Sequence, residues 1–198
     1  MVTTFPHLLL KHAAERPDAA ALREKEYGIW QTWTWADVAR DARHMACGLA
    51  ALGLAKGQNL AFISDNRPHV YIGFVAVQSL GAVPIPLYQD AVAQEMGFVM
   101  QDAEIAFAFA ENQEQVDKLL EVRESHPGIQ HIIYDDPRGL RNYNQPGLIS
   151  TEQLKQLGAE WDRSHPGVWD SMARAVQPED VSVILYTSGT TGKPKGVC

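Results

Sequence analysis

The sequence predicts a layered α/β fold, with mostly parallel sheets flanked by helices. Short apolar runs typical of buried strands recur along the chain, for example at 60–63, 105–110 and 129–134. Segments with the spacing of amphipathic helices separate these runs, and glycine or proline marks most boundaries. Strands that alternate with helices pair in parallel, because each helical connection returns the chain to the same edge of the sheet.

The first predicted elements are a β-hairpin and a helix. Residues 20–33 are interpreted as two strands that turn at Tyr27-Gly28. Thr34 is predicted to cap the helix that follows, with Asp37 in its first turn. Apolar residues continue at helical spacing over 38–52, and a glycine follows them.

The next predicted unit is a strand, a helix and a second strand. Residues 60–63 form the first strand, and Asn66 and Pro68 suit the cap and first turn of the helix. Residues 83–87 form the second strand. Its two prolines cannot donate hydrogen bonds, so this strand is predicted at a sheet edge or with irregular pairing.

The second half of the chain continues the alternation. A loop rich in proline, glycine and asparagine is predicted at 134–150. The remaining predictions are helices at 90–102, 113–124 and 151–161, and strands at 105–110, 129–134 and 181–186.

Composition excludes several classes of protein. The chain has 17 Lys plus Arg and 24 Asp plus Glu, a net charge of −7, which disfavours a nucleic-acid partner. The only cysteines are Cys47 and Cys198, too few for a disulfide framework, and Cys47 is expected to be buried and inert. The seven histidines lack metal-ligand spacing. Trp30, Trp33 and Trp35 are expected in core or strand-face positions.

The N-terminus has no pattern of a basic segment followed by an apolar core, so no signal peptide is predicted. The most apolar stretch, 70–88, contains polar residues and two prolines, and is interpreted as a buried helix and strand. We therefore expect a cytoplasmic protein, and the stretch leaves peripheral membrane contact open. No feature of the sequence indicates an oligomeric state.

The residues with the clearest chemistry follow the last predicted strand. Thr187 to Gly196 contains three glycines, four hydroxyl side chains and two lysines within ten residues. Glycines let backbone N–H groups converge on an anion, while hydroxyls and lysines add donors and charge. The segment is not a Walker loop, because Thr187 and Pro194 stand where that pattern needs Gly and Ser or Thr. Two interpretations remain: a phosphate-binding loop, or a polar turn between two strands.

The thirteen residues Ile184 to Gly196 resemble, without a break, the signature loop of the adenylate-forming (AMP-binding) superfamily. Residues 32–38 and 76–87 also resemble segments of that superfamily. Residues 112–120 and 132–140 look most like the long-chain fatty acid–CoA ligases. The resemblance implies that the fold is the N-terminal part of the large domain of such an enzyme.

The resemblance also implies a reaction and a site. In the family, ATP activates a carboxylic acid to an acyl-adenylate, and coenzyme A then takes the acyl group. The matching loop holds the β- and γ-phosphates of ATP, and the position of Thr187 also helps to hold Mg²⁺. The residues of this sequence implied to bind phosphate are Thr187, Ser188, Gly189, Thr190, Thr191, Gly192 and Lys195.

The family's adenine-binding, ribose-binding and lysine-bearing segments follow the loop and have no match in residues 1–198. We therefore expect 1–198 to be a fragment that ends just after the phosphate-binding loop and is inactive alone. The implied partners are small molecules: ATP, a fatty acid and coenzyme A. The alternative hypothesis is a stand-alone nucleotide- or phosphate-binding module without catalysis.

Overall fold

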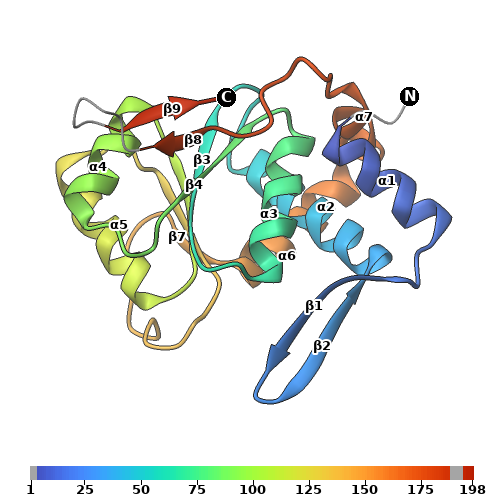
Figure 1. The fold of residues 1–198 in the computed structure, drawn as a ribbon, viewed down its shortest axis with the longest axis horizontal. Coiled ribbons are helices and arrows are strands. Elements are labelled where there is room, and N and C mark those ends of the chain that lie inside the picture. The colour runs from blue at the N-terminus through green and yellow to red at the C-terminus, as the bar shows by residue number, and fades with distance from the viewer. Residues whose placement is uncertain (1–3, 188–193) are drawn as a thin grey trace. The chain divides into compact units, whose positions relative to one another are not determined.

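The structure, a computed structural model, describes residues 4–187 and 194–198 (Figure 1). The helices are α1 (Phe5–Glu15), α2 (Trp35–Ala51), α3 (Pro68–Ser79), α4 (Ala93–Asp102), α5 (Gln113–Ser125), α6 (Thr151–Ser164) and α7 (Val168–Ala175). The strands are β1 (Ala20–Glu26), β2 (Ile29–Thr34), β3 (Asn59–Ile63), β4 (Val83–Leu87), β5 (Phe107–Ala110), β6 (His131–Tyr134), β7 (Leu148–Ser150), β8 (Leu185–Thr187) and β9 (Lys195–Val197).

The chain divides into two compact units, each assembled from three separate stretches. The helical unit comprises Met1–Lys56, Asn66–Gly81 and Leu154–Asp180. The sheet unit comprises Gly57–Asp65, Ala82–Gln153 and Val181–Cys198.

The helical unit contains the predicted hairpin and capped helix. Strands β1 and β2 pair antiparallel, and the turn between them places Tyr27 and Gly28 at φ values of 48° and 82°. Two consecutive positive φ angles are typical of a type I′ turn, whose twist matches that of the strands. Thr34 Oγ1 accepts a hydrogen bond from the Asp37 amide, and the Thr34 amide donates to the Asp37 carboxylate. Both predictions are confirmed.

Helices α2 and α6 approach each other at two glycines. A Cβ added at Gly158 would lie 1.7 Å from the carbonyl oxygen of His44, and one added at Gly48 would lie 2.3 Å from that of Leu154. No Cβ atom can lie so close to a carbonyl oxygen. The glycines therefore allow two helix backbones to touch, an arrangement that the sequence alone did not predict.

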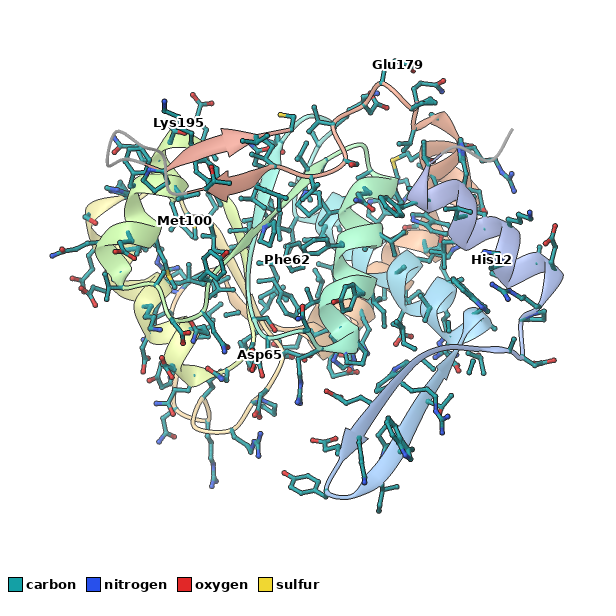
Figure 2. The ribbon with its side chains drawn as sticks, viewed as in Figure 1. His12, Phe62, Asp65, Met100, Glu179 and Lys195 are labelled. Atoms are coloured by element: carbon teal, nitrogen blue, oxygen red, sulfur yellow. The ribbon has the colours of Figure 1, made fainter. Side chains whose placement is uncertain are left out.

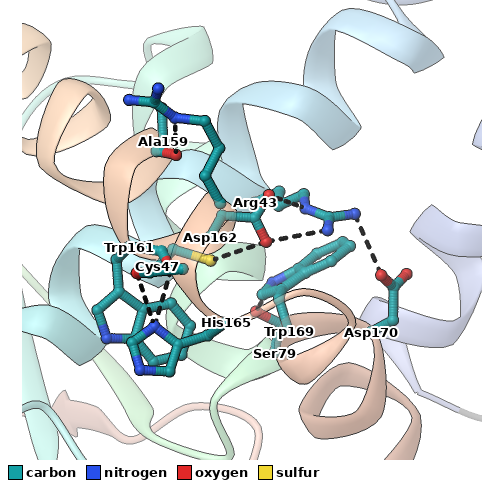
Figure 3. Close-up of polar contacts among 11 residues, drawn as sticks. Arg43, Cys47, Ser79, Ala159, Trp161, Asp162, His165, Trp169 and Asp170 are labelled. Atoms are coloured by element: carbon teal, nitrogen blue, oxygen red, sulfur yellow. Dashed lines mark hydrogen bonds and ion pairs between the residues drawn. The ribbon is translucent and has the colours of Figure 1, made fainter.

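A polar network joins four helices of the helical unit (Figure 3). Arg43 on α2 binds both carboxylate oxygens of Asp162 on α6, at 2.8 and 2.9 Å, and a further nitrogen lies 3.1 Å from Asp170 on α7. Its guanidinium carbon lies 5.4 Å from the ring centroid of Trp169, which donates to Ser79 on α3 at 2.9 Å. One arginine thus links segments that are more than a hundred residues apart in the sequence.

The sheet unit contains five parallel strands in the order β4-β3-β5-β6-β7, which confirms the predicted fold class. Helices α4 and α5 pack with this sheet around an apolar cluster. Strand β4, with its two prolines, is at the sheet edge as predicted. The buried members of the cluster include Ile63, Ile85, Met96, Val99, Val116, Leu119 and Ile132.

The apolar stretch 70–88 forms a buried helix followed by a strand, α3 and β4, as predicted. In the described part of the chain, no helix combines the length and apolar character needed to cross a membrane. Cys47 is fully buried, which also agrees with the prediction.

Several predicted boundaries differ from the structure. Arg67, not Asn66, is the residue that precedes α3, and Asn66 instead accepts a hydrogen bond from Tyr71. Helix α4 begins after Val92 rather than at position 90. The strand predicted at 181–186 forms only over Leu185–Thr187. Side-chain hydrogen bonds with nearby residues compete with capping, so a suitable cap residue does not by itself place a boundary.

Four elements were not predicted, among them the three-residue strand β9. Strand β7 has three residues and falls within the segment interpreted as a loop. Helix α7 has eight residues and follows Gly167, which has a φ of 78°. Helix α1 begins four residues from the chain start, with Thr4 as its cap. The two strands and α7 are too short to carry much periodicity, and hydrogen bonds to neighbouring segments decide whether they form. Helix α1 has 11 residues, an ordinary length, and was missed.

Candidate functional site

The structure describes two of the seven residues predicted to bind phosphate, Thr187 and Lys195. They lie at the ends of strands β8 and β9, and Figure 2 labels Lys195 at the start of β9. The other predicted residues lie outside the described part of the chain: Ser188, Gly189, Thr190, Thr191 and Gly192.

Thr187 and Lys195 are opposite partners in an antiparallel pair of strands. The register pairs Leu185 with Val197, Tyr186 with Gly196 and Thr187 with Lys195. Opposite residues of an antiparallel pair share one face, with side chains in contact range. Both Thr187 and Lys195 are exposed. A hydroxyl group and an ammonium group therefore stand on one face, at the two ends of the intervening segment.

The pair of strands β8 and β9 is anchored within the sheet unit through the face opposite to Thr187 and Lys195. Ile184 and Tyr186 pack against the apolar cluster of that unit, and the Ile184 amide donates to the carbonyl oxygen of Pro84 at 3.3 Å. The Tyr186 hydroxyl donates to the Asp102 carboxylate at 2.6 Å. Burial, and then the bond to this carboxylate, raises the pKa of Tyr186 above its usual value, so the phenol remains a proton donor.

Gly196 fits closely against this anchor. A Cβ at position 196 would lie 2.9 Å from Ile184 Cγ2 and 3.3 Å from the ring of Tyr186. The last glycine of the loop motif therefore has a packing role. Sequence reasoning placed Tyr186 and Gly196 in the motif but missed their positioning role, and it missed Asp102 and Pro84 entirely. The two-residue alternation of Ile184 and Tyr186 was the available signal.

The arrangement offers a neutral oxygen and a cation to an anionic ligand. A Lys ammonium is a compact charge with three donors, suited to phosphate oxygens, and a Thr hydroxyl can donate to the same oxygens. A metal site is not formed by the described residues, among which no group of three His, Cys, Asp or Glu side chains could hold an ion. The described groups at this position are thus one hydroxyl and one ammonium.

A second polar cluster lies at the carboxyl ends of β3 and β5, and sequence reasoning missed it. Glu111 accepts hydrogen bonds from the Ser64 hydroxyl at 3.1 Å and from the Asp65 amide at 2.7 Å. Gln89 donates to the Asp65 carboxylate at 2.8 Å, and Figure 2 labels Asp65. Ligands of open parallel sheets often bind beyond this edge. Here the polar groups bind one another and tie together the loops that follow neighbouring strands.

Comparison with known proteins shows the family to which this fold and loop motif belong. The family model described as "AMP-binding enzyme" matches residues 9–198. The chain belongs to this family.

Curated relatives include long-chain-fatty-acid–CoA ligases. The ligase FadD15 of Mycobacterium bovis is 29% identical over 189 residues, which are 96% of this chain and 30% of the relative. The ligase ACSBG2 of Xenopus laevis is 28% identical over 181 residues, covering 91% of this chain and 24% of the relative. The chain thus spans less than a third of the length of these relatives.

Solved structures support the fold. The anthranilate CoA ligase AuaEII, in complex with anthranoyl-AMP, matches with a TM-score of 0.75 at 20% identity, over 97% of this chain and 33% of that chain. Acetoacetyl-CoA synthetase from Streptomyces lividans matches with a TM-score of 0.72 at 23% identity, over 97% of this chain and 29% of that chain. At these identities the likeness concerns the fold alone.

Proposed function

We propose that residues 1–198 are the N-terminal part of an AMP-binding domain that uses ATP to activate a carboxylic acid. The observation that carries the proposal is the unbroken thirteen-residue motif at 184–196, which falls inside the family match over residues 9–198. The products of the first step are an acyl-adenylate and pyrophosphate. In the second step the thiol of coenzyme A takes the acyl group and AMP leaves.

The loop's proposed task is to stabilise the leaving pyrophosphate. A carboxylate oxygen of the substrate forms a bond to the α-phosphorus of ATP while the bond to the β-phosphate oxygen breaks. Negative charge then develops on the β- and γ-phosphates, where Lys195 and Thr187 would supply a cation and a donor. Preorganised donors act most strongly where charge develops, and this step requires no proton transfer by the loop.

Magnesium fits the described residues only in part. Mg²⁺ prefers six oxygen ligands and usually combines one or two carboxylates with substrate phosphates and water. The exposed Thr187 hydroxyl offers one such oxygen, and the described residues hold no cluster of three acidic, His or Cys ligands. Thr187 would therefore contribute at most one ligand. When bound, the ion would neutralise phosphate charge.

The proposed substrate is a long-chain fatty acid. The support is the resemblance at 112–120 and 132–140, together with the printed names of the curated relatives. The protein encoded by the whole reading frame should release pyrophosphate faster with palmitate than with acetate or an amino acid. The opposite order would contradict the substrate while leaving adenylation intact.

The decisive experiment measures pyrophosphate release together with thermal unfolding in that protein. Lys195→Ala and Thr187→Ala should each slow adenylate formation by about 10²- to 10³-fold, the usual cost of removing a donor from a developing anion. Both side chains are exposed, so stability should change by no more than about 0.5 kcal/mol. Gly189→Val should slow the reaction more than either, because glycine permits close approach of the backbone to phosphate.

Lys11→Ala is the matched control, because Lys11 is an exposed lysine on α1. It should leave the rate unchanged. Near-normal rates for Lys195→Ala and Thr187→Ala would contradict the phosphate-binding role and favour the polar-turn interpretation. ATP binding without pyrophosphate release, with every acid tested, would favour the binding module. The 198-residue chain alone should form no acyl-adenylate.

A further inference from the structure

The β1–β2 hairpin of the helical unit separates its charged side chains by sign. The register pairs Arg23 with Thr32 and Lys25 with Trp30, so these four side chains share one face, which we call the outward face. All four are exposed. Glu24 and Glu26 alternate with them and belong to the opposite, inward face. The outward face therefore has two cations and no acidic side chain, on a chain whose net charge is −7.

The inward face packs against its own unit. Glu24, with 18% of its side chain exposed, forms an ion pair of 3.1 Å with Arg67. Trp33 meets the edge of His69 on α3, with 6.1 Å between ring centroids. Leu22 is half-buried on the same face. These contacts fix which face of the hairpin is presented to solvent.

The tip of the hairpin is apolar and exposed. Tyr27 is 83% exposed, Ile29 65% and Trp30 56%. The sequence predicted that Trp30 lies in the core or on a strand face. Trp30 lies on a strand face and is not in the core. Arg23 lies over the Trp30 ring, with 5.0 Å between the guanidinium carbon and the ring centroid. In Figure 1 the hairpin extends from α1 and α2 as a two-stranded arm.

We propose that the outward face and tip of this hairpin dock on an anionic lipid surface. Trp and Tyr are amphipathic and favour the boundary between headgroups and acyl chains. Lys and Arg beside them bind anionic headgroups, and each cation near such a surface raises affinity roughly 5-fold. Glu24 and Glu26 lie on the inward face, where Glu26 pairs with Ile29, so the outward face itself presents its cations without an acidic side chain. Charge complementarity therefore identifies the partner.

The same chemistry suits a nucleic acid less well. Single strands bind by stacking bases on aromatic rings beside cations, and Tyr27 and Trp30 offer such rings, but base stacking makes no use of the exposed aliphatic Ile29. An aliphatic side chain beside a Trp is instead suited to insertion among acyl chains. The type I′ turn holds Tyr27 and Ile29 at the tip, so little conformational freedom is lost on docking. The proposal is independent of the acid-activating reaction.

The test is binding of the full chain to vesicles of phosphatidylcholine, with or without phosphatidylglycerol, measured by flotation at 0.1 M salt. Vesicles that contain phosphatidylglycerol should bind more tightly. The double variant Arg23→Glu/Lys25→Glu should weaken that binding by at least roughly 25-fold, since each cation contributes about 5-fold. Ile29→Ser should weaken it without changing the charge.

Two matched controls separate docking from general electrostatics. Arg141→Glu/Arg174→Glu makes the same charge change at two other exposed arginines and should alter binding less than 2-fold. Phospholipids brominated on the acyl chain should quench tryptophan fluorescence in the parent protein. Trp30→Phe should abolish this quenching, while Trp161→Phe should retain it.

Failure to bind either kind of vesicle would overturn the proposal. So would equal loss of binding in the two double variants, because the location of the charge would then not matter. Tighter binding to a single-stranded oligonucleotide than to vesicles, with the same dependence on Arg23 and Lys25, would assign the face to nucleic acid. Circular dichroism melts of the variants at Arg23, Lys25, Ile29, Trp30, Arg141 and Arg174 should match the parent, since these side chains are exposed.

Discussion

The helical unit and the sheet unit hold their helices in place by different means. In the sheet unit, α4 and α5 meet an apolar cluster whose side chains fit against the alternating residues of parallel strands. In the helical unit, α2, α6 and α7 meet through one arginine, two aspartates and a pair of glycines at which the α2 and α6 backbones touch. Both units bury apolar side chains, and the helical unit adds close backbone approach and charge geometry to its apolar core.

This difference indicates where the sequence tolerates substitutions. Apolar cores accept many side chains of suitable volume, so a periodic pattern is enough to specify them. A contact between two backbones accepts glycine alone, and a bidentate arginine requires its particular carboxylate. Stability should therefore respond most steeply at the glycines, then at the apolar cluster, and least at the partly exposed ion pairs.

The largest effect is expected for Gly158→Ala. The added methyl group would meet the carbonyl of His44, which is backbone and cannot move aside without displacing α2. We expect a loss of about 4 kcal/mol or more, at the upper end for overpacking. Urea unfolding measures it. Gly128→Ala, where nothing lies within 4 Å, should cost under about 0.5 kcal/mol. Equal costs at both positions would contradict backbone contact.

Leu119→Ala should follow, with a loss of about 3 kcal/mol. Leu119 is fully buried in the apolar cluster, so its truncation removes apolar contacts and leaves a cavity. Leu8→Ala is the control, because Leu8 is 40% exposed on α1 and should cost less than about 1 kcal/mol. Unfolding midpoints of the two variants compare the sites. A loss of stability for Leu119→Ala no larger than that for Leu8→Ala would mean that the apolar cluster is loosely packed.

Asp162→Asn should have a smaller effect, about 1 to 2 kcal/mol. Removing one partner of a fully buried ion pair usually costs more stability than this. Here the side chains of Arg43 and Asp162 are 30% and 17% exposed, and Arg43 keeps its ion pair with Asp170. The double variant Arg43→Met/Asp162→Leu should be less destabilised than Asp162→Asn, because no buried charge is left unpaired and Asp170, which loses Arg43, is 38% exposed. A double-mutant cycle measures this coupling. Additive losses would contradict a coupled network.

The smallest effect on stability is expected at Cys47, where the first test measures the chemical reactivity of the thiol. Burial, and then the nearby Asp162 carboxylate, raises the pKa of Cys47 to about 12. At pH 8, iodoacetamide should label the exposed Cys198 in the folded chain and both thiols after unfolding. Mass spectrometry counts the labels. Rapid labelling of folded Cys47 would show that the helices around it open readily.

The same shift gives a pH dependence. A thiol of the unfolded chain ionises near pH 8.5. Above that pH the unfolded chain binds fewer protons than the folded chain, in which Cys47 stays protonated. The free energy of unfolding should therefore fall as pH rises beyond about 8.5. Cys47→Ala should reduce this slope, as denaturant titrations at pH 7 and pH 10 would measure.

The comparison also explains which predictions succeeded. Strands β3, β5 and β6 of the sheet unit were predicted because their apolar runs are continuous, and β4 was placed at an edge because proline cannot donate to a neighbour. The cap at Thr34 was predicted because capping is a local hydrogen bond. The Arg43 network was not predicted, since its partners are 119 and 127 residues further along the chain.

For the candidate site, the motif at 184–196 supplied the predicted residues, and the described structure adds how two of them are held. Thr187 and Lys195 face each other because β8 and β9 pair in one register. In this pair, Tyr186 donates a hydrogen bond to Asp102 and Gly196 fits closely against Ile184. No spacing rule links Asp102 to Tyr186, so local sequence could not indicate this anchor.

The sequence by itself determined the alternation of strands and helices, the parallel sheet, the hairpin turn and the family to which the chain belongs. These depend on interactions between residues near one another, or on a contiguous motif. Only the tertiary structure decided the glycine contact between α2 and α6, the arginine network and the outward charge of the hairpin. Those features arise when distant segments pack, because packing alone sets which side chains become neighbours and which face solvent.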